Sequence, residues 1–148
     1  MGGINLGRVV LGGLLAGLLI DVSEYLLNEV VLGQQMEAAM QRLNLPPVRG
    51  SAIGVFVVLG FALGIASVWF YAAIRPRFGA GVRTALCAGS AVWFFAYLYP
   101  SVGLWVLGFF PAGVLTFAVV WGLVELLVAT TAGAWLYQEA PRPVSAKA

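Results

Sequence analysis

The longest uncharged stretch of the sequence, Thr84–Val124, limits the fold more than any other feature. Its 41 residues include no Asp, Glu, Lys or Arg. As one helix the stretch would measure about 60 Å, roughly twice the thickness of the hydrocarbon core of a bilayer. A stretch this long and apolar must therefore cross a membrane and fold back, and we predict the turn between Pro100 and Pro111.

The rest of the chain has a similar character. Hydrophobic residues make up 61% of the 148 residues and charged residues only 9%, which is typical of integral membrane proteins. We predict a single all-α domain over residues 1–140, a bundle of four transmembrane helices with spans at about 6–32, 51–74, 84–104 and 112–137. The alternative for residues 100–110 is a half-buried or re-entrant segment, which needs cover from protein or water.

Residues 33–50, between the first two spans, follow a different pattern. Within Gln34–Asn44, apolar residues recur at i, i+3, i+4 and i+7 among polar ones, which indicates a short amphipathic helix on the membrane interface. A solvated extension of the first span is the alternative, and Pro46 and Pro47 end the helix in either case. Residues 141–148, polar and rich in proline, are predicted to form a disordered cytoplasmic tail.

Basic residues near the ends of the spans predict the orientation of the chain. Six of them fall on the side of the termini and two on the side of residues 33–50. Because short loops rich in Lys and Arg stay in the cytoplasm, we expect both termini to be cytoplasmic and the 33–50 segment to face outward. The six are Arg8, Arg75, Arg77, Arg83, Arg142 and Lys147, and the two are Arg42 and Arg49.

Residue types that the sequence lacks exclude several kinds of chemistry. It contains no histidine, which removes the usual axial ligand of haem, the commonest ligand of transition metals and the Ser/His/Asp triad. Cys87 is the sole cysteine, so the chain can form no internal disulfide. An enzyme would be left with a carboxylate mechanism, and we predict no enzyme activity, no cofactor and no metal site. Nucleic-acid binding is also not expected, since no basic stripe is interleaved with aromatic residues.

Three acidic residues, Asp21, Glu24 and Glu125, lie well inside the predicted spans, with no Lys or Arg at their depth. Lipid cannot solvate them, so each must be protonated, bind a cation, meet water or pair with another chain. A carboxyl that exchanges its proton for a cationic substrate would make a transport site, and these three are the candidate residues for proton or cation binding. The alternative is structural, in which hydrogen bonds to hydroxyl or indole groups of neighbouring helices hold the bundle together.

Helical spacing places these acids among small and aromatic residues. In the first span, Gly13, Gly17, Asp21, Glu24 and Asn28 follow at intervals of four, four, three and four residues, so they share one stripe. An acid beside Trp or Tyr can accept their hydrogen bonds or form a cage for an organic cation, although packing is the simpler role for most aromatic residues. The predicted cavity-lining residues are Asn28, Tyr71, Trp93, Tyr97 and Trp121, and the predicted helix-packing residues are Gly13, Gly17, Gly60, Gly64 and Gly133.

Two resemblances bear on the class of protein. The sequence contains the stretches LGRVVLGGLLAGLLI, LNLPPV, YAAIRPRFG and AYLYPSVG. These resemble small uncharacterised four-helix membrane proteins of bacteria, which implies the bacterial inner membrane and no known activity. In plan, the chain also resembles the small multidrug resistance exporters, with four short-looped helices and an acid in the first. Those proteins are shorter and lack a loop like that at 33–50, so no residue roles are carried over.

Two classes of function remain. The first is proton- or cation-coupled transport, or small-molecule binding, by a homo-oligomer that uses Asp21, Glu24 and Glu125. The second is a non-catalytic structural or accessory subunit that packs its glycine stripes against a larger membrane complex. A transport protein is expected to have a wet cavity that reaches Asp21 or Glu125. A subunit is expected to bury these residues against helices and to present a large apolar outer face.

Overall fold

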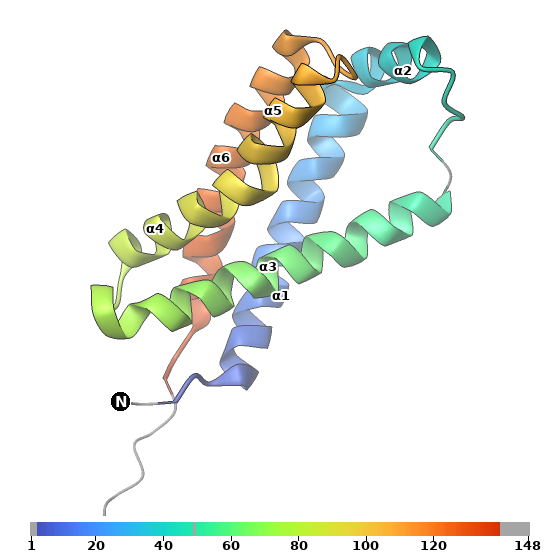
Figure 1. The fold of residues 1–148 in the computed structure, drawn as a ribbon. Helices are drawn as coiled ribbons and strands as arrows, with labels where there is room; N and C mark the ends of the chain where they lie inside the picture. Colours follow the sequence, from blue (N-terminus) through green and yellow to red (C-terminus); the bar gives the residue numbers. More distant parts are fainter. Residues whose placement is uncertain (1–2, 49, 140–148) are drawn as a thin grey trace, which may run out of the picture.

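The computed structural model describes residues 3–48 and 50–139, which form helices and the turns between them (Figure 1). Four helical segments are long and apolar enough to cross a membrane: Leu6–Val31, Gly50–Phe78, Val82–Val106 and Ala112–Leu136. The prediction of an all-helical chain with four long apolar helices is confirmed to this extent. The tail predicted at residues 141–148 lies outside the described residues.

The first segment consists of α1 (Leu6–Tyr25) and the π-helix η1 (Leu26–Val31). The Asn5 side chain caps α1 by accepting a 3.2 Å hydrogen bond from the backbone N–H of Arg8. At Leu32 the backbone leaves the helical conformation, with φ −107° and ψ 4°. A bend therefore separates η1 from the ten-residue α2 (Gly33–Arg42), which ends before Pro46.

The second segment is α3 (Gly50–Phe78), which ends four residues later than the predicted span. Pro76 lies in its last turn, where the missing proline N–H costs a single backbone hydrogen bond. The helix ends instead at Gly79, whose φ of +85° favours glycine. Thr84 stabilises this end, because its hydroxyl donates a 2.7 Å hydrogen bond to the Gly79 carbonyl.

The third segment runs without interruption through α4 (Val82–Trp93), the π-helix η2 (Phe94–Leu98) and α5 (Tyr99–Val106). Pro100 does not end it, and this proline stands in the first turn of α5, directly after the π-helix η2. Residues 100–106 are helical and continue the third segment. The chain turns at Gly108, with φ +72°, before α6 (Ala112–Leu136) begins.

The long helices pack around α1 and α6, which contact each other. Helix α1 also contacts α3, and α6 contacts both α3 and α4. The start of α1 and the end of α6 lie at one end of the molecule, which we call the termini end (Figure 1). The opposite end, where α2 lies near the α5–α6 turn, is the α2 end. There the Arg42 guanidinium donates hydrogen bonds of 3.1 and 3.0 Å to the carbonyls of Gly108 and Phe109.

The first part of α3 stands clear of the other helices at the α2 end (Figure 1). Every residue from Ile53 to Leu59 is exposed, on all sides of the helix, and buried positions begin at Gly60. The apolar core therefore lies between Gly60 and the termini end. Its fully buried side chains include Ala16, Ile20, Val68, Ala88 and Leu126.

Candidate functional site

Glycines let α1 and α3 cross with their backbones in contact. A Cβ atom added to Gly13 would lie 2.5 Å from the Cα of Ile65, and one added to Gly64 would lie 2.6 Å from the Cα of Gly17. Separations this short leave no room for any side chain at either position. The crossing of α1 and α3 thus depends on the absence of Cβ atoms, as in other close helix pairs of membrane proteins.

Gly60 extends this crossing and makes room for a carboxyl group. A Cβ atom at Gly60 would lie 2.8 Å from Cγ of Asp21 and would overlap its Oδ1. The Asp21 side chain therefore occupies the space that Gly60 leaves on α3. Its Oδ2 is buried and has no hydrogen-bond partner among the described residues.

The adjacent side of α1 contacts α6 in a similar way. A Cβ atom at Gly133 would lie 2.6 Å from the carbonyl oxygen of Gly12 and 3.2 Å from the Cβ of Ala16. The structure thus places all five predicted packing glycines at helix crossings. Gly12 belongs with them, and its position directly before Gly13 in an apolar helix was a signal for it.

The centre of the site is a cluster of Glu24, Tyr97 and Glu125, which we call the carboxyl–phenol cluster. Glu24 comes from α1, Tyr97 from η2 and Glu125 from α6. The phenol oxygen of Tyr97 lies 2.6 Å from Oε1 of Glu24 and 2.6 Å from Oε1 of Glu125. Three helical segments that are distant in the sequence are therefore joined by one hydroxyl group.

These two contacts require a proton on the cluster. A phenol has one hydrogen, so it can donate to one carboxyl oxygen and must accept a hydrogen bond at the other contact. Only a protonated carboxyl can donate there, since an ionised carboxylate is acceptor-only. At least one of Glu24 and Glu125 is therefore a carboxylic acid when both 2.6 Å contacts are made.

Neighbouring side chains position the cluster. The Tyr97 ring lies over Gly122, where an added Cβ atom would come 2.6 Å from Cε1 of the ring. The amide of Asn28 donates 2.7 and 2.9 Å hydrogen bonds to Oε2 and to the backbone carbonyl of Glu24. Gly122 was missed in the sequence, although its place three residues before Glu125 puts both on one helix face.

Burial differs across the cluster. Glu125 is 6% exposed, and its second oxygen, Oε2, is buried with no hydrogen-bond partner among the described residues. Glu24, Asn28 and Tyr97 are half-buried. Burial of polar groups without partners is costly, and within the described residues Oε2 of Glu125 is the carboxyl oxygen of the cluster that bears this cost.

The indole groups predicted to line a cavity instead tie helices together. Trp121 of α6 donates a 2.8 Å hydrogen bond to the Ser23 hydroxyl of α1, next to Glu24. Trp93 of α4 donates a 2.8 Å hydrogen bond to the backbone carbonyl of Val119. Both therefore lock α6 to a neighbour, as in the structural alternative considered for the polar groups of the spans.

Tyr71 lies away from the carboxyls, near the termini end. Its hydroxyl accepts a 3.2 Å hydrogen bond from the backbone N–H of Gly81, and its ring meets that of Tyr137 edge to face at 6.0 Å. Arg75 lies over the Tyr137 ring, 5.5 Å from its centroid, and forms a 3.5 Å ion pair with Glu139. Tyr71 thus belongs to an aromatic and ionic contact that closes the termini end.

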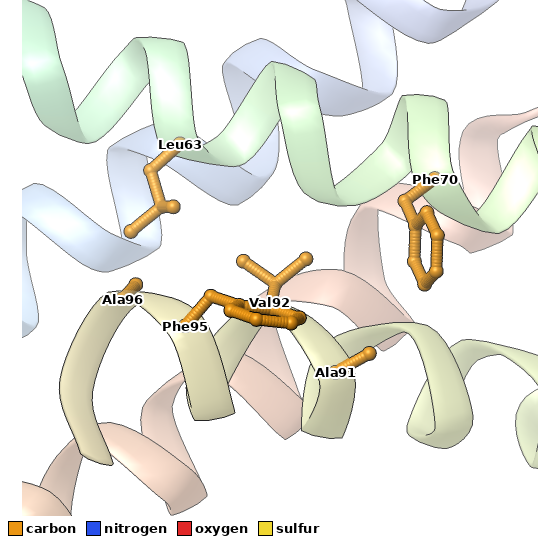
Figure 2. Close-up of a pocket in the computed structure, with 6 residues that line it drawn as sticks. All are labelled: Leu63, Phe70, Ala91, Val92, Phe95 and Ala96. Carbon is orange, nitrogen blue, oxygen red and sulfur yellow. The ribbon is translucent and has the colours of Figure 1, made fainter. Parts of the chain in front are cut away.

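Two grooves on the surface of the described residues are apolar. The first, about 320 Å³, lies between α3 and the α4–η2 segment. It is lined by apolar side chains, among them Leu63 of α3 and Ala96 of η2 (Figure 2). The second, about 350 Å³, is lined by residues of the α2–α3 connection and the start of α3, among them Met40, Pro47 and Phe56. Neither groove is lined by a carboxyl group.

No group of three or more His, Cys, Asp and Glu side chains that could hold a metal ion occurs within residues 3–48 and 50–139. The polar centre of this part of the chain is built from two carboxyls, a phenol and an amide. Such a set can hold and transfer protons. Comparison of the chain with protein families, with curated proteins and with solved structures finds no significant match.

Proposed function

We propose that the chain is a multi-pass protein of the bacterial inner membrane that binds and releases a proton at the carboxyl–phenol cluster. This proton binding would serve proton-coupled transport by a homo-oligomer. The single observation that carries the proposal is the Tyr97 hydroxyl, 2.6 Å from both Glu24 and Glu125, which needs a carboxyl proton. Ionisable groups inside a membrane are expensive and commonly mark proton or ion pathways.

The membrane location is supported by four apolar helical segments of 25 to 29 residues. At about 1.5 Å per residue, each is long enough to cross the hydrocarbon core. The excess of basic residues at the termini end supports cytoplasmic termini, with α2 as an amphipathic helix on the outer surface. Arg42→Cys in a Cys87→Ala background tests this, since an impermeant maleimide added to intact cells should label α2.

Infrared spectroscopy of the carboxyl stretch tests proton binding directly. A band from a protonated carboxyl should be present in purified protein and should disappear as the pH is raised. Glu125→Gln and Glu24→Gln should change this band. Glu37→Gln, at an exposed position on α2, is the matched control and should leave it unchanged. Absence of a titrating band would overturn the proposal.

Transport requires that the titration respond to a substrate. Na⁺ and tetraphenylphosphonium are suitable probes, because a cation that competes for the cluster must displace its proton. A carboxyl band that shifts with either cation would support proton-coupled transport. A band that titrates but ignores every added cation would favour the second candidate function.

That second candidate is a non-catalytic accessory subunit of a larger membrane complex. It is favoured by two observations. Neither of the two grooves described above reaches Asp21 or Glu125, and every residue of Ile53–Leu59 is exposed on all sides of α3. A helix that stands away from its own bundle could pack against another protein. Crosslinking from Val55 and Val58 in native membranes distinguishes the candidates, since a subunit should give one defined adduct with a different protein, whereas a homo-oligomer should give adducts only with a second copy of this chain.

A further inference from the structure

The two sides of the carboxyl–phenol cluster differ in polarity. Toward the termini end, the next layers of the core are apolar and almost fully buried. Their side chains are at most 1% exposed. They are Ala16, Ile20, Val68, Leu126 and Ala129. We call this set the apolar plug.

Two polar side chains lie among the plug residues, but neither continues the cluster. Ser67 is fully buried and donates its 2.8 Å hydrogen bond to the Leu63 carbonyl of its own helix. Thr130 is also fully buried, and its hydroxyl has no hydrogen-bond partner among the described residues. On this side, therefore, no chain of hydrogen bonds leads away from Glu125 within the part of the chain that the structure describes.

Toward the α2 end, polar groups follow one another in steps. Counted from the middle of each long segment at about 1.5 Å per residue, Glu125 lies near the midpoint and Tyr97 about 4.5 Å toward the α2 end. On the same count Glu24 lies about 8 Å and Asn28 about 14 Å from the midpoint. The last position is near the edge of the hydrocarbon core, which is about 15 Å from the centre of a bilayer.

Each step of this series is a hydrogen-bonded contact. Glu125 meets Tyr97, Tyr97 meets Glu24, and Glu24 accepts from Asn28. The exposure changes in the same direction, from the buried Glu125 to the half-buried Glu24 and Asn28 and then to the exposed Glu29. Both π-helices lie along this route, with Tyr97 in η2 and Asn28 in η1, and π-helical turns are frequent at functional sites.

We propose that the carboxyl–phenol cluster exchanges its proton with water only at the α2 end, through Glu24 and Asn28, while the apolar plug closes the route to the termini end. The inference rests on the proposed function and adds a direction to it. A proton bound at Glu125 would enter and leave on one side of the membrane in this conformation.

The proton moves by a concerted shift that leaves Tyr97 neutral. The O–H bond of Glu125 breaks as a new O–H bond forms at the phenol oxygen, and the original phenol O–H bond breaks as its proton passes to the Glu24 carboxylate. Two O–H bonds break and two form, so one proton has moved from Glu125 to Glu24. Glu24 then releases it to water near Asn28.

The groups that face the cluster come from each neighbouring helix. Asp21 and Glu24 of α1 and the phenol of Tyr97 are the titratable groups that act on Glu125, and the Ser23 side chain also lies close to it. The segment of α3 from residue 51 to 74 has no charged residue. Proton exchange at Glu125 therefore depends on these acidic neighbours. No basic residue of the 51–74 segment of α3 contributes to it.

Sided chemical labelling tests the inference. A quaternary carbodiimide that cannot cross membranes reacts with protonated carboxyls that it reaches from water. It is added to right-side-out and to inverted membrane vesicles, and modified residues are identified by mass spectrometry. Glu37 on α2 and Glu139 at the termini end, both exposed, report which side the reagent reaches. Glu24 should be modified together with Glu37 and not with Glu139, and modification together with Glu139 would overturn the inference.

Hydrogen–deuterium exchange of the carboxyl band gives a second measurement. Asn28→Leu should slow exchange about tenfold, since one lost polar step raises the barrier by the worth of about one hydrogen bond. Asn28→Gln, which keeps an amide, should restore fast exchange, and Thr130→Val in the closed half should leave the rate unchanged. Equal slowing by Thr130→Val, or none by Asn28→Leu, would overturn the inference. The proposed function fails separately, if no carboxyl band titrates at all.

Discussion

Helix α1 makes two different kinds of contact with its neighbours. One is with α3, and the other is with η2 and α6. Toward α3, Gly13 and Gly17 bring the backbones together, and a Cβ atom at either position would overlap α3. Toward η2 and α6, Glu24 reaches a shared phenol and a second carboxyl through side-chain hydrogen bonds. The first contact is one of backbone shape at Gly13 and Gly17, with the Asp21 carboxyl at its edge against Gly60, whereas the second consists of hydrogen bonds between ionisable side chains.

This difference explains how a rigid bundle can contain a titratable site. The backbone contacts at Gly13, Gly17 and Gly64 do not involve Glu24, so they hold α1 in place whatever the state of that carboxyl. The cluster can then lose a proton without loss of the whole fold. We therefore expect substitutions at the two contacts to differ in size and in their dependence on pH.

The largest effect is expected at the glycine crossing. Gly64→Val places side-chain atoms against the Cα of Gly17, where backbone cannot move aside, and should lower the free energy of unfolding by about 3 kcal/mol or more. Unfolding in mixed micelles with increasing detergent denaturant measures this. Gly54→Val, on the same helix with nothing within 4 Å of its Cβ position, is the control and should be close to neutral. Equal losses in both variants would contradict a role for backbone contact.

Loss of the phenol hydroxyl should be the next largest effect. Tyr97→Phe keeps the ring over Gly122 but leaves both carboxyls without their shared partner, which should cost about 1 to 3 kcal/mol in the same unfolding assay. Tyr99→Phe, two residues away at an exposed position, removes a hydroxyl without a buried partner. A loss in Tyr99→Phe as large as in Tyr97→Phe would show that the bridging hydroxyl has no special part in stability.

The pH dependence of stability should separate the two contacts. The folded protein needs a carboxyl proton for both Tyr97 contacts, so its stability should fall as the pH rises and that proton is lost. The slope for one proton is at most about 1.4 kcal/mol per pH unit. Glu125→Gln, whose neutral amide needs no added proton, should flatten this dependence, whereas Gly64→Ala should lower stability and keep the slope. A wild-type protein without this slope would count against the shared proton.

The smallest effect is expected at the indole beside the cluster. Trp121→Phe keeps an aromatic ring next to Phe117 but removes the N–H that donates to Ser23. Interhelical hydrogen bonds of this kind in membrane proteins average about 0.6 kcal/mol, and a loss of that size is expected. Trp135→Phe, at a position 86% exposed, should have no effect on the same measurement. A loss of several kcal/mol in Trp121→Phe would mean that this bond also controls the geometry of Glu24.

The four long helices followed from the sequence because long apolar stretches have few alternatives in a membrane. Their predicted ends lie within four residues of those in the structure. The largest difference is at α3, which continues through Pro76 to Phe78, because a missing N–H is tolerated in a terminal turn. Glycines with positive φ, Gly79 and Gly108, end the helices instead, and a sequence does not reveal which of its many glycines adopt that conformation.

The candidate residues were predicted as a set, but their grouping was not. Helical periodicity placed Asp21, Glu24 and Asn28 on one stripe of α1, and the structure divides that stripe between two neighbours. Asp21 faces α3 at Gly60, whereas Glu24 meets Tyr97 and Glu125. Residues three and four apart on a helix share a broad face, and the helices that cover each part of it are set by crossing angles that periodicity does not contain.

The sequence by itself determined that the chain is helical and apolar, that it has no histidine chemistry, and that a few acids must lie where lipid cannot solvate them. These conclusions depend on composition and on spacing along one helix, which are local properties. Only the tertiary structure decided that one phenol would join two of the acids and that the plug would close one side. Those are contacts between residues distant in the sequence, and Tyr97 is 73 residues from Glu24 and 28 residues from Glu125. Their geometry arises from how closely glycines let the helices approach, which no single segment specifies.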